Sequence, residues 1–373
     1  MKIALISCGR SDYSIYLPLM RKLQTDSFFD LNIIAFGTHV SHFYDRTVDL
    51  FYKDGFEVSY ELESLVLGDS PEAISTAMGL TTVKFSSIWS RENYDMIIVL
   101  GDRYEMFSAI VASIPFNIPV THLYGGDTTL GAFDDIFRHS ITLMSKLHLV
   151  SLPSCADRVK QITGTSEGIH VVGVINLDSL DQIKILSKQE FKQIWNIDLS
   201  IPTVLVTYHP ETIALKNNIE SIKELCKAMD QINKQFVITM PNNDTMGTEI
   251  RTEILNFIGS NTEKYKIVEV LGTSGYYSCI KHCDFLLGNT SSGITEAASF
   301  HKYVINLGNR QKGRMAGENV FHVPLKEDKI LKAVKKIVDL PPFTKPNIYH
   351  KENSTGSIIS ALKTFHNNNN NNK

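Results

Sequence analysis

Three aspartates in the first half of the chain stand where protons could be moved. Asp102 follows an apolar run and precedes Arg103, whose positive charge would keep the carboxylate ionised as a proton acceptor. Asp127 follows a second apolar run and two glycines, which permit a close approach of the backbone to a ligand. Asp134 opens a helical pattern, where N-capping is the structural alternative. These acids are candidates for acid–base chemistry.

The second half of the chain offers polar side chains at similar places. His209 ends an apolar run and is followed by a proline, so it stands at a strand tip. There it can exchange a proton or bind a phosphate, and a satisfied loop histidine is the alternative. Asn242 and Asn243 follow the next strand pattern, and their amides suit neutral hydroxyl groups or the edge of a base.

A glycine- and hydroxyl-rich segment over 288–296 is the strongest indication of an anion-binding site in the sequence. Its backbone amides and hydroxyls can hold a diphosphate without a metal, and the residues concerned are Thr290, Ser291, Ser292 and Gly293. Glu296, one helical turn later, is placed to bind a ribose diol. The segment matches neither the P-loop nor the dinucleotide-binding glycine pattern, which disfavours ATPase and NAD chemistry.

Three arginines are candidates for the charge of a phosphate. Arg310 and Arg314 lie in a basic loop after a strand pattern, and a merely solvated loop is the alternative. Arg10 lies at the turn between the first strand and the first helix, where the helix dipole favours an anion. An ordinary turn capped by Asp12 is the alternative there.

The elements that must position these residues alternate between short apolar strands and longer amphipathic helices. Runs of Val, Ile and Leu without polar alternation are typical of parallel strands that are buried on both faces. The rhythm restarts after Gly173, which predicts two doubly wound, Rossmann-like α/β domains. The ligand would lie in a cleft between them, beyond the carboxyl ends of the strands.

The expected organisation has four parts. Residues 1–173 form the first domain, which carries the acids, and residues 174–350 form the second, which binds the nucleotide. Residues 351–366 form a helix that folds back onto the first domain. The closing asparagine tract, within 367–373, cannot bury apolar surface and is expected to be disordered.

Composition and charge restrict the class of protein. The 373 residues are 43% hydrophobic and 21% charged, as in a globular protein. The formal net charge of −3 argues against nucleic acid as a partner. The five cysteines form no disulfide framework, and no apolar run approaches the roughly 20 residues that a bilayer crossing needs. We therefore expect a cytoplasmic protein without a membrane anchor.

Taken in order, these motifs resemble the UDP-N-acetylglucosamine 2-epimerase family, and within it the hydrolysing branch of sialic acid synthesis. The resemblance spans nearly the whole chain and adds the motifs around Arg138-His139 and 314–320. It implies the two-domain fold of many glycosyltransferases, called glycosyltransferase B. It also implies homodimers or homotetramers and a reaction without a metal or redox cofactor.

The reaction that the resemblance implies removes the C2 proton of UDP-GlcNAc and expels UDP from C1. Water then adds to the resulting 2-acetamidoglucal while C2 is reprotonated on the opposite face, which gives free N-acetylmannosamine. By resemblance, the catalytic residues are Asp102, Arg103, Asp127, Asp134 and His209. The UDP-binding residues are Arg10, Asn242, Asn243, Thr290, Ser291, Ser292, Gly293, Glu296, Arg310 and Arg314.

Two positions depart from the family pattern. Many relatives have Glu where this chain has Tyr124, and often Glu rather than Asp at position 127. The change could adapt the pocket to another sugar, such as the 2,4-diacetamido-6-deoxy hexose of the legionaminic acid route. A non-hydrolysing epimerase, a glycosyltransferase of the same fold and an inactive nucleotide-sugar sensor are the alternatives.

Overall fold

The computed structural model describes residues 1–68, 70–178, 180–211, 213, 215–241, 246–269 and 271–371. The chain forms two compact units. Unit 1 comprises residues 1–127, 134–179 and 351–373, and unit 2 comprises residues 128–133 and 180–350. The division near residue 180 lies a few residues after the expected position, Gly173. Residues 128–133 belong to unit 2, where the Leu130 amide donates to the Lys312 carbonyl at 2.9 Å.

Unit 1 is built on a parallel sheet of seven strands in the order β3-β2-β1-β4-β5-β6-β7. The strands are β1 (Lys2–Ser7), β2 (Asp30–Phe36), β3 (Val58–Leu62), β4 (Met96–Leu100), β5 (Val120–Leu123), β6 (Leu147–Val150) and β7 (Ile169–Val171). All residues of β4 and β5 are buried, as their apolar runs predict. The strand order reverses between β1 and β4. This is the switch point where open α/β sheets bind ligands.

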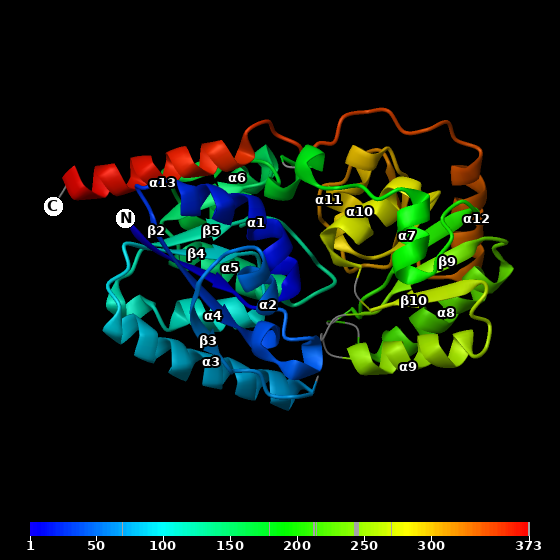
Figure 1. Cartoon of the computed structure of the whole chain (residues 1–373), viewed down its shortest axis with the longest axis horizontal. Helices are drawn as coiled ribbons and strands as arrows, with labels where there is room; N and C mark the ends of the chain where they lie inside the picture. Colours follow the sequence, from blue (N-terminus) through cyan, green and yellow to red (C-terminus); the bar gives the residue numbers. More distant parts are fainter. Residues whose placement is uncertain are drawn as a thin grey trace. The chain divides into compact units, whose positions relative to one another are not determined.

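Helices cover both faces of this sheet (Figure 1). They are α1 (Arg10–Thr25), α2 (Asp49–Lys53), α3 (Pro71–Arg91), α4 (Tyr104–Val111), α5 (Asp134–Met144), α6 (Pro153–Thr163) and α13 (Ser354–Asn371). One core packs α1 and α13 against the sheet, and the opposite core packs α3, α4 and α5. The Ser70 side chain caps α3 by accepting from the Ala73 amide, which fixes where this long helix begins.

Unit 2 repeats the design with six parallel strands in the order β10-β9-β8-β11-β12-β13. They are β8 (Thr203–Thr207), β9 (Gln235–Thr239), β10 (Tyr265–Val268), β11 (Phe285–Gly288), β12 (Val304–Leu307) and β13 (Val320–Val323). Its switch point lies between β8 and β11. The prediction of two doubly wound α/β domains is confirmed.

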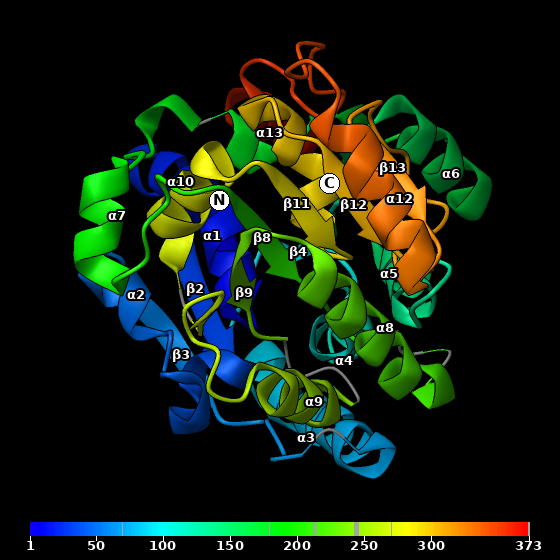
Figure 2. The same ribbon diagram turned by 90° about the vertical axis from the view of Figure 1, so that its right-hand side faces the viewer.

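The helices of unit 2 also lie on both faces of its sheet. They are α7 (Lys188–Trp195), α8 (Asn218–Gln231), α9 (Gly247–Ile258), α10 (Gly272–His282), α11 (Ser291–Thr295) and α12 (Glu327–Val338). Figure 2 shows α8 and α12 side by side, and their apolar side chains share one core. The helical stretch after β11 is in two pieces, because α11 ends at Thr295 and a 3₁₀ turn follows over Ala297–Phe300.

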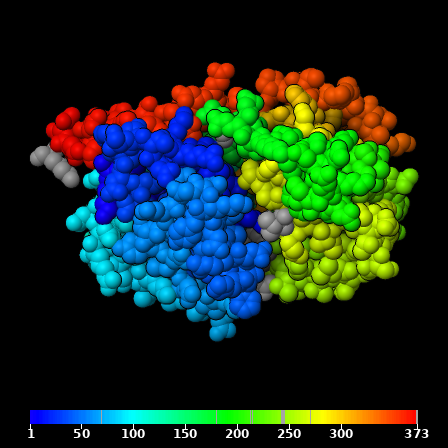
Figure 3. All heavy atoms as spheres, viewed as in Figure 1, coloured from blue at the N-terminus to red at the C-terminus, as the bar shows by residue number. Residues whose placement is uncertain are grey.

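The end of the chain differs from the expectation of a disordered tail. Helix α13 packs Ile358 and Leu362 into the core of unit 1 and continues to Asn371. In Figure 3 its surface lies beside residues near the N-terminus, where Lys363 pairs with Asp26 at 2.7 Å. The asparagines extend a helix whose preceding turns are already packed, so they need no burial of their own. No helix within the described ranges has both the length and the apolarity for crossing a bilayer.

Candidate active site in two units

The switch point of unit 1 gathers the predicted acids around a buried arginine. Arg138, on α5, is 1% exposed, and its guanidinium contacts the carboxylates of Asp102 and Asp135 and the Asp127 carbonyl, the last at 3.1 Å. Burial lowers the pKa of Arg138. The carboxylates of Asp102, Asp127, Asp135 and Asp134 raise this pKa by more, so it lies above the ordinary value. The structure thus brings Asp102, Asp127 and Asp134 to one cation.

Arg103, which follows Asp102 directly, pairs with an acid two residues further along the chain. Its guanidinium donates to both carboxylate oxygens of Glu105, at 3.2 and 2.9 Å. Glu105 is only 2% exposed, so this pair satisfies a buried acid at the start of α4. Asp102 pairs with Arg138, which lies 36 positions further along the chain.

The glycines before Asp127 approach other parts of unit 1 closely. A Cβ at Gly125 would lie 2.8 Å from the His122 ring, and one at Gly126 would lie 2.2 Å from the Cys155 carbonyl oxygen. Both glycines are therefore required for packing within the unit. Tyr124 is half-buried, and its hydroxyl accepts from the Ile175 amide at 2.8 Å. Its hydroxyl thus has a structural function at this position.

The turn after β1 contains Asp12, the expected cap, and Arg10, the expected ligand-binding residue. Asp12 is buried, and its carboxylate accepts from the amides of Cys8 and Gly9 at 2.9 and 3.1 Å, so it caps the turn. Burial raises the pKa of Asp12 more than the nearby Arg103 and these hydrogen bonds lower it. Arg10 is exposed in the first turn of α1, where its side chain is accessible to a ligand.

In unit 2, the fully buried side-chain amide of Asn289 links His209 to the segment predicted to bind an anion. The His209 amide donates to the Asn289 side-chain oxygen at 2.7 Å, and the Asn289 side-chain amide donates back to the His209 carbonyl at 2.8 Å. Because Asn289 follows β11 directly, this pair of hydrogen bonds joins the carboxyl ends of β8 and β11. Gly288 has φ 146°, and a Cβ there would lie 1.9 Å from the Thr207 carbonyl oxygen.

The backbone of Asn289 orders the basic loop. The Asn289 carbonyl accepts from the Gln311 side chain at 2.9 Å and from Arg310 at 3.4 Å. Arg314 donates to the Gln311 side-chain oxygen at 3.0 Å. The two arginines expected to bind phosphate thus adjoin the segment that begins at Gly288.

The hydroxyl-rich segment itself is partly open to solvent. Thr290 precedes α11, Ser291 is exposed, and Gly293 is buried against Val304. The Ser292 hydroxyl lies 3.2 Å from that of Thr290 and contacts the Tyr276 hydroxyl. Burial, followed by the charge of Glu296, raises the pKa of Tyr276. Glu296 therefore lies near the same hydroxyls. Asn242 and Asn243 lie outside the described residues.

The residues that sequence reasoning did not name as site residues are those that hold the predicted ones. They are Arg138 in unit 1 and Asn289 and Gln311 in unit 2. The spacing of Asp135 and Arg138 on one helix was the available signal for Arg138. For the two amides, no local pattern distinguishes a buried support from a ligand-binding side chain.

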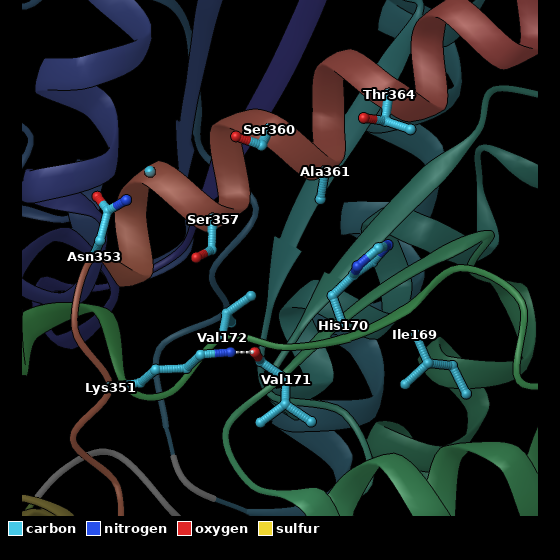
Figure 4. Close-up of a pocket in the computed structure, with 11 residues that line it drawn as sticks. Ile169, His170, Val171, Val172, Lys351, Asn353, Ser357, Ser360, Ala361 and Thr364 are labelled. Atoms are coloured by element: carbon cyan, nitrogen blue, oxygen red, sulfur yellow. Dashed lines mark hydrogen bonds between the residues drawn. The ribbon is translucent and has the colours of Figure 1, made fainter.

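A hollow of about 580 Å³ in unit 1 lies away from this chemistry. Figure 4 shows it between α13 and the edge strand β7, with His170, Lys351 and Ser357 among its lining residues. β7 stands three places from β4 in the sheet, whereas the candidate acids follow β4 and β5 or open α5. The hollow is therefore separate from the acid cluster.

Residues 21–363 match the family model described as UDP-N-acetylglucosamine 2-epimerase. The chain belongs to this family. A Campylobacter jejuni relative named GDP/UDP-N,N'-diacetylbacillosamine 2-epimerase (hydrolyzing) is 33% identical over 86% of this chain and 83% of its own. A Legionella pneumophila relative named UDP-N,N'-diacetylbacillosamine 2-epimerase (hydrolyzing) is 30% identical over 98% of this chain and 96% of its own.

The predicted family, its hydrolysing branch and the class of enzyme, a hydrolysing 2-epimerase, are therefore confirmed. The fold of this epimerase is shared with solved members. The crystal structure of UDP-GlcNAc 2-epimerase from Neisseria meningitidis bound to UDP-GlcNAc matches 98% of this chain and 100% of its own. Its TM-score is 0.83 at 18% sequence identity.

Proposed function

We propose that this epimerase converts a UDP-linked 2-acetamido sugar to UDP and the free 2-epimer, and that N,N'-diacetylbacillosamine is the preferred sugar. The names of the two relatives that are at least 30% identical support the sugar. UDP-GlcNAc is the second candidate, supported by a 25% identical Neisseria meningitidis relative named UDP-N-acetylglucosamine 2-epimerase. From UDP-GlcNAc the free product would be N-acetylmannosamine.

The observation that carries the proposed reaction is the gathering of three aspartates around Arg138. In the first step, one carboxylate takes the proton from C2, the C1–O bond breaks, and UDP leaves with its electron pair. We assign Asp102 as this base, because its contact with the buried guanidinium favours the ionised carboxylate. The organic product of this step is a 2-acetamidoglucal.

The second step adds water to C1 and a proton to C2 on the opposite face of the sugar. A single carboxylate cannot serve both faces, so inversion at C2 needs a second acid–base group. Asp127 and Asp134 supply the candidates, and both are near enough to Arg138 to raise its pKa. One of them would donate the proton, while another acidic group accepts a proton from the attacking water.

We assign UDP to unit 2. Thr290, Ser291, Ser292 and Gly293 would bind the diphosphate, and Glu296 would bind the ribose. Arg310, Arg314 and His209, which Asn289 and Gln311 hold, would stabilise the departing charge. Arg10 would add a cation from the N-terminal turn of α1.

A panel of sugar nucleotides tests the proposal. Purified protein would be incubated with UDP-N,N'-diacetylbacillosamine, UDP-GlcNAc and UDP-GalNAc, and nucleotide and sugar would be quantified by chromatography. The proposal predicts one UDP and one free 2-epimer per turnover, with the diacetamido sugar fastest. A sugar that stays attached to UDP would favour the non-hydrolysing reaction. Turnover that requires an added acceptor would favour a glycosyltransferase.

We place this reaction in the cytoplasm, in the synthesis of acidic sugars of the sialic and legionaminic type. An Escherichia coli relative that is 29% identical and named polysialic acid biosynthesis protein P7 supports this assignment. We also expect a homodimer or homotetramer, as the family resemblance implies. Light scattering of the purified protein would measure the assembly, and a monomer at micromolar concentration would contradict this expectation.

A further inference from the structure

A buried histidine supports the backbone that carries Asp102. His122 lies on β5, and its side chain is fully buried. Its Nε2 atom lies 2.7 Å from the Gly101 carbonyl oxygen, and its Nδ1 atom lies 3.1 Å from the Thr142 hydroxyl. Gly101 directly precedes Asp102 and has φ +71°, in the left-handed region. The ring therefore lies between α5 and the turn that presents the predicted base.

The chemistry of the neighbours fixes the proton on this ring. Burial lowers the pKa of His122 to about 3, more than the Gly101 carbonyl raises it, so the imidazole is neutral and has one N–H. A carbonyl oxygen can only accept, so the proton is on Nε2 and is donated to Gly101. Nδ1 then accepts from the hydroxyl of Thr142, which is also fully buried.

Helix α5 holds the Asp102 turn at two points. Arg138 contacts the Asp102 carboxylate, and Thr142, four residues later on the same helix face, holds His122. A Cβ at Gly125 would lie 2.8 Å from His122 Nδ1 and 2.9 Å from the Thr142 hydroxyl oxygen. A glycine at this position therefore leaves room for the histidine–threonine pair. The Gly101 amide also donates to the Leu123 carbonyl of β5 at 2.9 Å.

We infer that His122 and Thr142 are positioning residues for Asp102, which they orient through the Gly101 carbonyl. The inference rests on the proposed function of Asp102 as the base. It goes further by assigning a function in turnover to His122, whose ring bonds to the Gly101 carbonyl and the Thr142 hydroxyl. A loss of positioning should lower kcat and leave UDP affinity unchanged, because UDP is assigned to unit 2.

Two pairs of variants test the inference in the full-length protein. His122→Leu and Thr142→Val remove a hydrogen-bonding group, while His122→Gln and Thr142→Ser retain a donor at a similar place. Steady-state UDP release would give kcat and KM, UDP titration calorimetry would give Kd, and thermal unfolding would check the fold. We expect His122→Leu and Thr142→Val to lower kcat by about 10- to 100-fold. UDP Kd should change less than twofold, and the conservative variants should retain more activity.

The outcomes separate this inference from the proposed function. A folded His122→Leu with kcat within twofold of the wild type would overturn the inference, provided that Asp102→Asn is inactive. If Asp102→Asn is itself active, the proposed base is wrong and the inference falls with it. If His122→Leu does not fold, the two Thr142 variants decide. Equal kcat for Thr142→Val and Thr142→Ser would then contradict the inference.

Discussion

Arg138 is the residue on which the acid cluster of unit 1 depends. It is 1% exposed and contacts two carboxylates, so its removal would take a buried counter-ion away from like charges that lie near one another. The carboxylates at this site do not all have the same surroundings. The Asp102 side chain is 25% exposed, so it is accessible to a ligand, while the Arg138 side chain that it contacts is buried. This combination suits a base that must be both ionised and reachable.

The first prediction concerns the base itself. Asp102→Asn should lower kcat by about 10²- to 10⁴-fold, because an amide cannot accept the C2 proton. UDP affinity should change less than twofold, as measured by calorimetry. Asp157→Asn, which removes an exposed carboxylate on α6, is the matched control and should behave like the wild type. A parallel fall in UDP affinity and kcat for Asp102→Asn would refute the division of functions between the units.

The second prediction concerns the nucleotide. Arg314→Ala should weaken UDP binding by about 10- to 100-fold, the effect of losing one charge-assisted hydrogen bond. Calorimetry with UDP alone measures this without turnover. Lys312→Ala removes an exposed positive charge from the same loop and is the control, with an expected change below threefold. If the two variants weaken UDP equally, general charge rather than a specific contact accounts for binding.

At the scale of elements, strand ends explain most of what could be predicted from the sequence. Apolar runs identify buried strands, and residues just after them must meet at one edge of a parallel sheet. Asp102 and Asp127, which follow β4 and β5, both contact Arg138 there. Pairing of side chains was less predictable. Whether Asp102 pairs with Arg103 or with Arg138 depends on how α5 packs, and no local pattern contains that information.

The third prediction tests the last helix. Ile358 is fully buried where α13 packs on unit 1, so Ile358→Ala should lower the free energy of unfolding by about 2–5 kcal/mol. The side chains of residues 367–371 are exposed. Ending the chain after His366 should therefore change the free energy of unfolding by less than about 0.5 kcal/mol. Urea unfolding measures both. A truncation as costly as Ile358→Ala would show that the asparagine turns contribute to packing.

At the scale of the whole molecule, the two units share one topology and carry different polar groups at their switch points. Unit 1 carries the acids at its switch point, and unit 2 carries the cations and hydroxyls at its own. This placement of residue types was predictable from the sequence because each half has its own run of strands with its own polar ends. The supports of each set, such as Asn289, depend on contacts between loops that are distant in sequence.

The fourth prediction concerns stability against pH. Burial lowers the pKa of His39 and His122 to about 3 and that of His148 to about 4. The unfolded chain takes up these protons near pH 6.5, so stability is complete above that pH and is lost as pH falls toward 3–4. The slope is about 1 kcal/mol per pH unit for each histidine.

Urea unfolding at pH 7.5, 6.0 and 5.0 measures this slope. His148→Gln should make the free energy of unfolding less dependent on pH. A free energy of unfolding that stays constant from pH 7.5 to pH 5.0 would contradict the assignment of these histidines as neutral in the folded protein.

The most direct test of the proposed mechanism is the fate of the hydrogen at C2. Wild-type protein would turn over UDP-N,N'-diacetylbacillosamine in deuterated water, and the released sugar would be analysed by proton NMR and mass spectrometry. The mechanism predicts one deuterium at C2 in every molecule of the free epimer, together with an equal amount of UDP. A released sugar that retains its original hydrogen at C2 would contradict the account.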